Sequence, residues 1–105
     1  MAPFDLAFFM TPSLALKNQR VAIRQVAGHF RVANPRVFGS VLHGKDVEGS
    51  DLDLLVDPLP GTTLFDLGGL QMALEDLLGV PVDLLTPGDL PRKFRDVVLA
   101  EALPV

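Results

Sequence analysis

The sequence predicts a two-layer α/β domain, in which helices pack mainly on one face of a small sheet. Three segments carry apolar residues at helical spacing: residues 13–30, 64–78 and 91–102. Three short apolar runs have the length and composition of strands: residues 36–38, 52–56 and 80–85. Because a chain of 105 residues can bury a single core, we assign residues 1–105 to one domain.

Composition and charge exclude several classes of protein. The 13 acidic and nine basic residues give a net charge of −4, which argues against autonomous nucleic-acid binding. The chain has no Cys, so a disulfide framework and a thiolate metal site are excluded, and a cytoplasmic protein is expected. The apolar N-terminal arm around Phe4, Phe8 and Phe9 lacks a basic start and is too short to span a bilayer. We interpret the arm as a packed or partner-binding segment, with no membrane association.

The first helix is predicted over residues 13–30, with Ser13 as its N-cap. Lys17, Arg20 and Arg24 share one face of this helix, away from the apolar stripe. A solvated basic face is the favoured interpretation, and contact with a triphosphate or an acidic partner is the alternative.

A turn at residues 33–35 is expected to lead into the strand at residues 36–38. The strand ends at Gly39 and Ser40, and residues 41–44 have room for one helical turn before Gly44 stops it. Gly39 would let a phosphate approach the backbone, and Ser40 adds a hydroxyl and a free N–H at that turn.

Two carboxylates open the most apolar strand of the chain. Asp51 and Asp53, at i and i+2, leave the same face of a strand about 6–7 Å apart. Mg²⁺ takes oxygen ligands, usually one or two protein carboxylates together with phosphate oxygens. The pattern therefore indicates a site for a metal-bound nucleoside triphosphate.

The second long helix has clear local signals at both ends. Thr63 and Asp66 form a variant of the capping box, and Gly79 ends the helix. We expect the two glycines inside it, Gly68 and Gly69, to allow close packing on the sheet.

The last strand, residues 80–85, carries Asp83, and Pro81 predicts that it starts at or near a sheet edge. Pro91 suits the first turn of the last helix. Four apolar residues of that helix are expected to face the sheet: Phe94, Val97, Val98 and Ala102. The apolar tail with Leu103 and Val105 is a candidate docking surface, and core packing is the alternative.

Gly39-Ser40, followed after ten residues by Asp51-x-Asp53 and later by Asp83, resembles the signature of the DNA polymerase β-like nucleotidyltransferases. The short chain resembles their smallest members, the minimal nucleotidyltransferases. The resemblance covers residues 35–85, about half of the chain. It implies a mixed sheet in which the strands of Asp53 and Asp83 are neighbours.

The resemblance also implies the chemistry. An acceptor hydroxyl attacks the α-phosphorus of ATP and pyrophosphate leaves, with two Mg²⁺ ions stabilising the displacement. Asp51 and Asp53 would hold both ions, and Asp83 would ligate one of them and help to deprotonate the acceptor. Gly39 and Ser40 would contact the phosphates.

The sequence departs from the family pattern at Val41 and His43, where relatives commonly carry Arg. Lys45 or Arg36 is a candidate replacement for this positive charge. His43 itself is more simply interpreted as an exposed loop residue than as a catalytic one.

Minimal nucleotidyltransferases similar to this chain are often encoded beside HEPN ribonuclease toxins. The resemblance implies an antitoxin that places AMP on a tyrosine hydroxyl of a HEPN-type partner. Two alternatives remain open. One is a non-catalytic module that neutralises its partner by occlusion. The other is transfer to a small-molecule hydroxyl, such as that of an antibiotic, for which the chain would have to form an oligomer.

Overall fold

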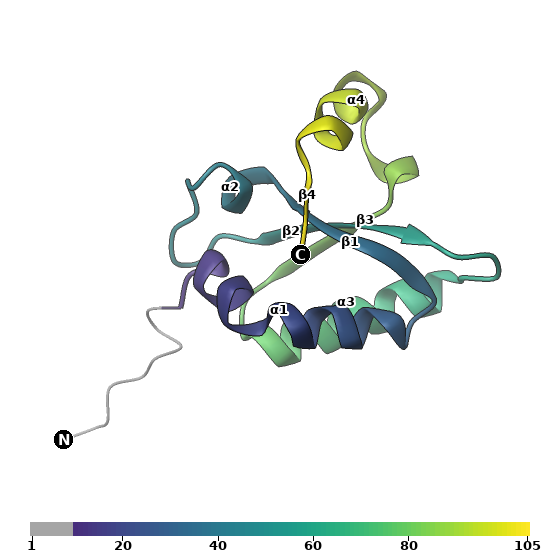
Figure 1. The fold of residues 1–105 in the computed structure, drawn as a ribbon, viewed down its shortest axis with the longest axis horizontal. Coiled ribbons are helices and arrows are strands. Elements are labelled where there is room, and N and C mark those ends of the chain that lie inside the picture. Colours follow the sequence, from purple (N-terminus) through teal and green to yellow (C-terminus); the bar gives the residue numbers. More distant parts are fainter. Residues whose placement is uncertain (1–9) are drawn as a thin grey trace.

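A four-stranded mixed sheet organises the computed structural model, which describes residues 10–105 (Figure 1). The predicted N-terminal arm with Phe4, Phe8 and Phe9 lies outside the described residues. The elements follow in the order α1 (Pro12–Gly28), β1 (Val32–Phe38), α2 (Gly39–Leu42), β2 (Leu52–Pro58), α3 (Leu64–Leu78), β3 (Val82–Leu85), the 3₁₀ turn η2 (Pro87–Asp89), α4 (Arg92–Glu101) and β4 (Leu103–Pro104).

The strands lie in the order β3-β2-β1-β4. β1 is antiparallel to both β2 and β4, whereas β2 and β3 are parallel. The predicted mixed sheet, the adjacency of the strands that carry Asp53 and Asp83, and the edge position of the Pro81 strand are all confirmed.

The two long helices, α1 and α3, lie side by side on one face of the sheet, while α2 and α4 stand on the other side (Figure 1). The main core lies between the sheet and the two long helices. Its fully buried members include Ile23 of α1, Leu52 and Leu54 of β2, and Leu70 and Leu74 of α3. In the described part of the chain, no helix is long and apolar enough to cross a membrane.

The N-cap of the first helix lies two residues before Ser13, because Thr11 is the cap and accepts a hydrogen bond from the Leu14 N–H. The prediction of Ser13 as the cap is therefore wrong. Ser13 instead donates from its N–H and its hydroxyl to Asp46, at 2.8 and 2.7 Å. Burial alone would raise the pKa of Asp46, but these hydrogen bonds outweigh it and lower the pKa. Ser13 thus anchors the loop that leads into β2.

Residues 33–35, predicted as a turn, belong to β1. The pairing with β2 shifts between Ala33 and Arg36, and Asn34 has a positive φ of 56°. A bulge of this kind accommodates Pro35 inside a strand, which a regular ladder would not.

The C-terminal tail forms β4 and pairs with Arg36 and Val37 of β1. Val105 is buried in the core, and its N–H donates to the Pro35 carbonyl. Arg24 donates to the Val105 carbonyl at 2.9 Å, and Arg20 approaches the Pro104 carbonyl at 3.5 Å. Two members of the predicted basic face therefore hold the tail, while Lys17 is exposed.

Helix α4 differs from the prediction that its apolar stripe covers the sheet. Phe94 and Val97 are 54% and 55% exposed, and no residue of α4 is fully buried. Val98 and Ala102 are half-buried. The periodicity identified an amphipathic helix, but only the chain path through η2 and β4 decides how closely such a helix approaches the sheet.

The predicted capping box of α3 is confirmed. The Thr63 N–H donates to the Asp66 carboxylate at 2.9 Å, and the Asp66 N–H donates to the Thr63 hydroxyl at 3.2 Å. Gly79 ends the helix in the left-handed conformation, also as predicted.

The adjacent glycines of α3 have different surroundings, and neither packs on the sheet as predicted. A Cβ at position 69 would lie 2.9 Å from the Phe30 ring, so Gly69 permits the contact between α3 and the end of α1. A Cβ at position 68 would meet nothing within 4 Å. The described residues therefore account for Gly69 and not for Gly68.

The two glycines provide a matched test of this packing. Gly68→Ala should raise the free energy of unfolding by about 0.5–1 kcal/mol, because alanine favours the helix and the site is open. Gly69→Ala should gain less or lose stability, because the Phe30 ring must move. Chemical denaturation of both variants measures the difference, and equal gains would contradict the contact.

Candidate active site

Strand β2 presents Asp53 on the face of the sheet opposite the main core. Leu52, Leu54 and Val56 are buried in that core. Since side chains alternate along a strand, Asp53 must project from the other face, the side on which α2 and α4 stand (Figure 1). Asp51 precedes the strand and is exposed.

Strand β3 brings the third predicted carboxylate to the same place. Asp53 and Asp83 are direct partners in the parallel register of β2 and β3, so their side chains leave the same face. On the other side of β2, Phe38 is the register partner of Asp53. The sheet therefore lines up Asp83, Asp53 and Phe38 across three strands.

Gly39 lies directly against Asp53. It has a φ of +73°, which favours glycine, and an added Cβ would lie 2.0 Å from Asp53 Oδ2. The turn that begins α2 thus approaches the carboxylate as closely as its backbone allows. The structure brings Gly39 and Ser40 together with Asp53 and Asp83, and the negative charge of the exposed Asp51 also acts on Asp53.

Among the described residues, negative charge dominates the surroundings of Asp53. Burial, followed by the negative charges of Asp83 and Asp51, raises the pKa of Asp53 to about 6, against the stabilising effect of the Ser40 N–H. A cation placed among these carboxylates would relieve their repulsion and favour the ionised form.

The donor set fits a hard divalent cation that shares its coordination with phosphate. Within residues 10–105, no three His, Cys, Asp or Glu side chains are arranged to hold a metal ion by themselves. Mg²⁺, however, commonly uses one or two carboxylates and completes its shell with water and phosphate oxygens. The Asp53–Asp83 pair beside the glycine turn meets this requirement.

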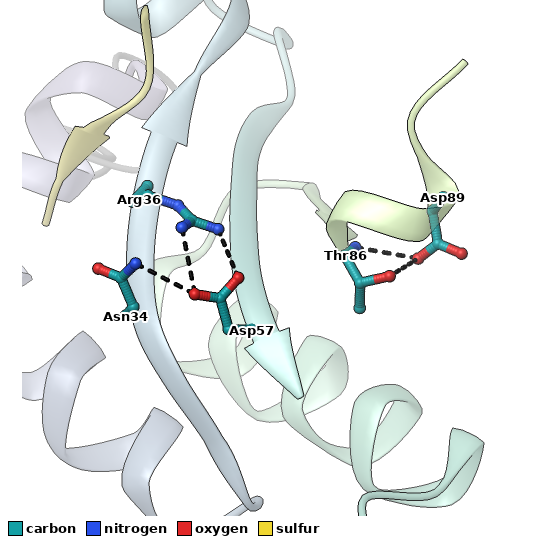
Figure 2. Close-up of polar contacts among 5 residues, drawn as sticks. All are labelled: Asn34, Arg36, Asp57, Thr86 and Asp89. Atoms are coloured by element: carbon teal, nitrogen blue, oxygen red, sulfur yellow. Dashed lines mark hydrogen bonds and ion pairs between the residues drawn. The ribbon is translucent and has the colours of Figure 1, made fainter. Parts of the chain in front are cut away.

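Two cation candidates from the sequence have different surroundings. Arg36 pairs with Asp57, with 2.8 Å between Nη2 and Oδ1, and Asn34 donates to the same carboxylate (Figure 2). The Arg36 side chain is only 13% exposed, so it stabilises the pairing of β1 with β2 rather than reaching a phosphate. Lys45 is exposed just beyond α2. In the same view, Thr86 and Asp89 form the capping box of η2, away from this ion pair (Figure 2).

The two positions at which the family resemblance implies Arg hold other residues here. Val41 is buried, and His43 is an exposed residue that ends α2. His43 Nε2 lies 3.2 Å from the Glu101 carboxylate at the end of α4. This contact links the glycine turn to the last helix, which the sequence interpretation of His43 as a simple loop residue missed.

Phe38 and the Ser13–Asp46 contact were also missed. Phe38 was interpreted only as an apolar strand residue, since its place beside Asp53 depends on strand register. The Ser13–Asp46 bond joins residues 33 positions apart, and no local pattern signals it.

A mixed sheet with two long helices on one face, and with a Gly-Ser turn against an Asp pair on the other, defines a class of enzyme, the nucleotidyltransferases. A family model described as "Nucleotidyltransferase domain" matches residues 20–105. The chain belongs to this family.

Relatives and solved structures agree with this assignment. A candidate protein adenylyltransferase of Methanocaldococcus jannaschii is 38% identical over 70% of this chain and 80% of its own length. The protein adenylyltransferase MntA of Thermococcus cleftensis is 35% identical over 78% of this chain and 83% of its own length.

A solved structure described as a candidate minimal nucleotidyltransferase has a TM-score of 0.80 and 38% identity, and the match covers 100% of both chains. A chain of a toxin–antitoxin crystal structure with AMP-PNP has a TM-score of 0.67 at 18% identity, over 84% of this chain and 70% of that one. This second likeness shows the fold alone.

Gly39→Ala tests the contact with Asp53, and Gly44→Ala is its matched control. Both glycines have a positive φ, so each alanine should cost about 1–2 kcal/mol of stability. Position 44 has open space, whereas position 39 would displace Asp53. Nucleotidyl transfer should fall at least tenfold more in Gly39→Ala than in Gly44→Ala, in assays of folded protein. Similar losses in both variants would contradict a role for this close approach.

The raised pKa of Asp53 predicts the pH dependence of metal-free stability. The native carboxyl holds its proton up to about pH 6, whereas the unfolded chain releases it near its ordinary pKa of 3.8. The native state binds more protons in this window, so stability falls as pH rises from about 4 to about 6.

Asp53→Asn removes this effect. In EDTA, its melting temperature should exceed that of the wild type at pH 7, and the difference should vanish near pH 4. Thermal unfolding of both proteins across this range measures it. Parallel pH profiles would mean that Asp53 has an ordinary pKa.

Proposed function

We propose that this chain transfers AMP from ATP to a hydroxyl group of a protein acceptor, with Mg²⁺ bound at its carboxylates. The placement of Asp53, against Gly39 and in register with Asp83, is the observation that carries the proposal. The names of the M. jannaschii and T. cleftensis relatives, both protein adenylyltransferases, support AMP as the group and a protein as the acceptor.

In this proposal Asp51, Asp53 and Asp83 are the metal ligands and the catalytic carboxylates. Bound Mg²⁺, as two ions, would neutralise the charge that develops on the phosphate oxygens. Gly39 and Ser40 bind the triphosphate through the backbone at the start of α2. Asp83, which is exposed, is the carboxylate that an incoming acceptor reaches, and it helps to remove the hydroxyl proton.

The reaction forms a bond between the acceptor oxygen and the α-phosphorus and breaks the bond to pyrophosphate. The hydroxyl proton passes to Asp83 or to solvent. Because the protein forms no covalent intermediate in this displacement, its contribution is to orient the reactants and to supply the charged environment.

A macromolecular acceptor agrees with the exposure of the site. Asp51 and Asp83 are both exposed, so a structured acceptor can reach them directly. The net charge of −4 disfavours a nucleic acid in this role. The reaction takes place in the cytoplasm, where ATP and Mg²⁺ are supplied.

We further propose that the acceptor is a HEPN-type ribonuclease toxin, modified on a tyrosine hydroxyl, and that the chain acts as its antitoxin. The similarity to the sequence of MntA and to a fold solved in a toxin–antitoxin complex with AMP-PNP supports this choice. An added AMP near the ribonuclease site would exclude RNA by its bulk and its negative charge.

One observation favours a second candidate function, neutralisation by binding alone. The positions where relatives commonly carry Arg hold a buried Val41 and a His43 that lies beside Glu101. Weak cationic support for a triphosphate would suit a module that occludes its partner without chemistry.

Co-expression with a HEPN-type partner, followed by intact mass measurement of the partner, separates the two functions. The enzyme should add one or more AMP units, and Asp51→Asn and Asp53→Asn should abolish the addition. Asp96→Asn, which removes an exposed carboxylate of α4 that has no role in the proposed site, is the control and should leave it unchanged.

Chelation of divalent metal by EDTA in the purified reaction should stop the addition, and excess Mg²⁺ should restore it. Two results together would reject the enzyme and support occlusion. Both Asp→Asn variants would still neutralise the toxin, and the toxin would gain no mass when it is co-expressed with the wild-type chain.

A further inference from the structure

The outward face of α3 carries large apolar side chains that the described residues leave exposed. Phe65 is 92% exposed, Leu64 is 85% exposed and Met72 is 68% exposed. Phe65, Gly68 and Met72 recur at i, i+3 and i+7, so they lie along one side of the helix, with Leu64 beside Gly68. An amphipathic surface helix ordinarily presents polar residues on this side. We call these four residues the α3 outer face.

Gly68 leaves a gap between the large apolar side chains of this face. Its neighbour Gly69 is explained within the chain by the Phe30 ring, whereas an added Cβ at position 68 meets open space. Glycine disfavours a helix interior, so its presence between Phe65 and Met72 has no local benefit among residues 10–105. A gap between large apolar side chains admits the side chains of another helix and lets the two backbones approach closely.

The negative charge around α3 indicates that the partner of this face carries basic residues. The sequence from Asp46 to Pro91 contains no Lys or Arg, although it holds most of the chain's 13 acidic residues. Asp76 is exposed one turn beyond Met72, on the same side of α3. Two copies of α3 would therefore bring together negative charges, with no cation from residues 46–91 to offset them. A partner helix with basic residues along the border of its apolar stripe would complement both features.

We propose that the α3 outer face is a docking surface for an amphipathic helix of a partner protein, one whose apolar stripe is bordered by Lys or Arg. Leu64, Phe65 and Met72 supply the apolar contacts, Gly68 receives the closest approach, and Asp76 faces the basic border.

The position of the surface gives it a function separate from transfer. α3 packs on the core side of the sheet, whereas Asp53 and Asp83 project from the other side (Figure 1). A helix docked on α3 leaves the carboxylates open. This inference therefore does not rest on the proposed transfer reaction.

A labelled synthetic peptide tests the surface directly. The probe is an amphipathic helix with a leucine stripe bordered by lysines, and its counterpart carries Glu in place of each Lys. Fluorescence anisotropy should show the Lys peptide binding at least tenfold more tightly than the Glu peptide. Asp53→Asn should bind it as the wild type does, which separates this result from any failure of the transfer reaction.

Gly68→Gln is the decisive variant, because it should weaken Lys-peptide binding at least tenfold without lowering the melting temperature. Gln favours a helix more than Gly does, and position 68 has room for it. Phe65→Ser should weaken binding similarly. Phe94→Ser, which alters an exposed apolar residue on the other side of the sheet, is the control and should have no effect.

Three results would overturn the proposal. One is equal affinity for the Lys and Glu peptides. The second is unchanged binding by Gly68→Gln. The third is a concentration-dependent dimer of the wild type, seen by sedimentation equilibrium and dissolved by Gly68→Gln, which would make the α3 outer face an interface between copies of this chain.

Discussion

Burial of one face of β2 fixes the rest of the structure. Leu52, Leu54 and Val56 enter the core against α1 and α3, so the alternation of side chains sends Asp53 to the opposite face. A shift of one residue in strand register would turn the carboxylate toward the core and turn Leu52 and Leu54 away from it. The same apolar contacts that hold the domain together therefore orient its chemistry. Register then brings Asp83 alongside, because β3 is parallel to β2 and pairs residue for residue.

The fold holds Asp53 in surroundings that disfavour its ionised form. Asp53 is partly buried between Asp83 and the backbone of Gly39, and its raised pKa reflects first this burial and then the negative charges of Asp83 and Asp51. Two cations near the sheet serve other contacts: Arg36 pairs with Asp57, and Arg24 holds the C-terminal strand. The negative charge around Asp53 lies where bound Mg²⁺ would supply positive charge. This agrees with membership of the nucleotidyltransferase family.

The two sides of the sheet have different chemistry. One side bears the carboxylates, with α2 and α4 standing around them and joined by His43 and Glu101. The other side ends in the apolar and acidic surface of α3, away from the reacting groups. The sheet therefore separates the proposed reactive face from the proposed docking surface on α3. The exposed apolar residues of α3 stand out because the same helix satisfies its own core, cap and C-terminus without them.

The sequence by itself determined the features that depend on neighbouring residues. These are the Thr63–Asp66 capping box, the Gly79 terminus, the Gly39-Ser40 turn and the placement of Asp53 at the start of an apolar strand, whereas Asp51, predicted to open that strand, precedes it. Short-range sterics and hydrogen bonds fix all of them, so local patterns predicted them. Tertiary structure alone decided the β1 bulge at Asn34, the pairing of the tail as β4, the exposed stripe of α4, and the ion pair of Arg36 with Asp57. Each of these joins segments far apart in the chain or depends on how an element is held at both ends. Their energies come from contacts that form only when the whole sheet is assembled, and a local window of sequence does not contain the partners.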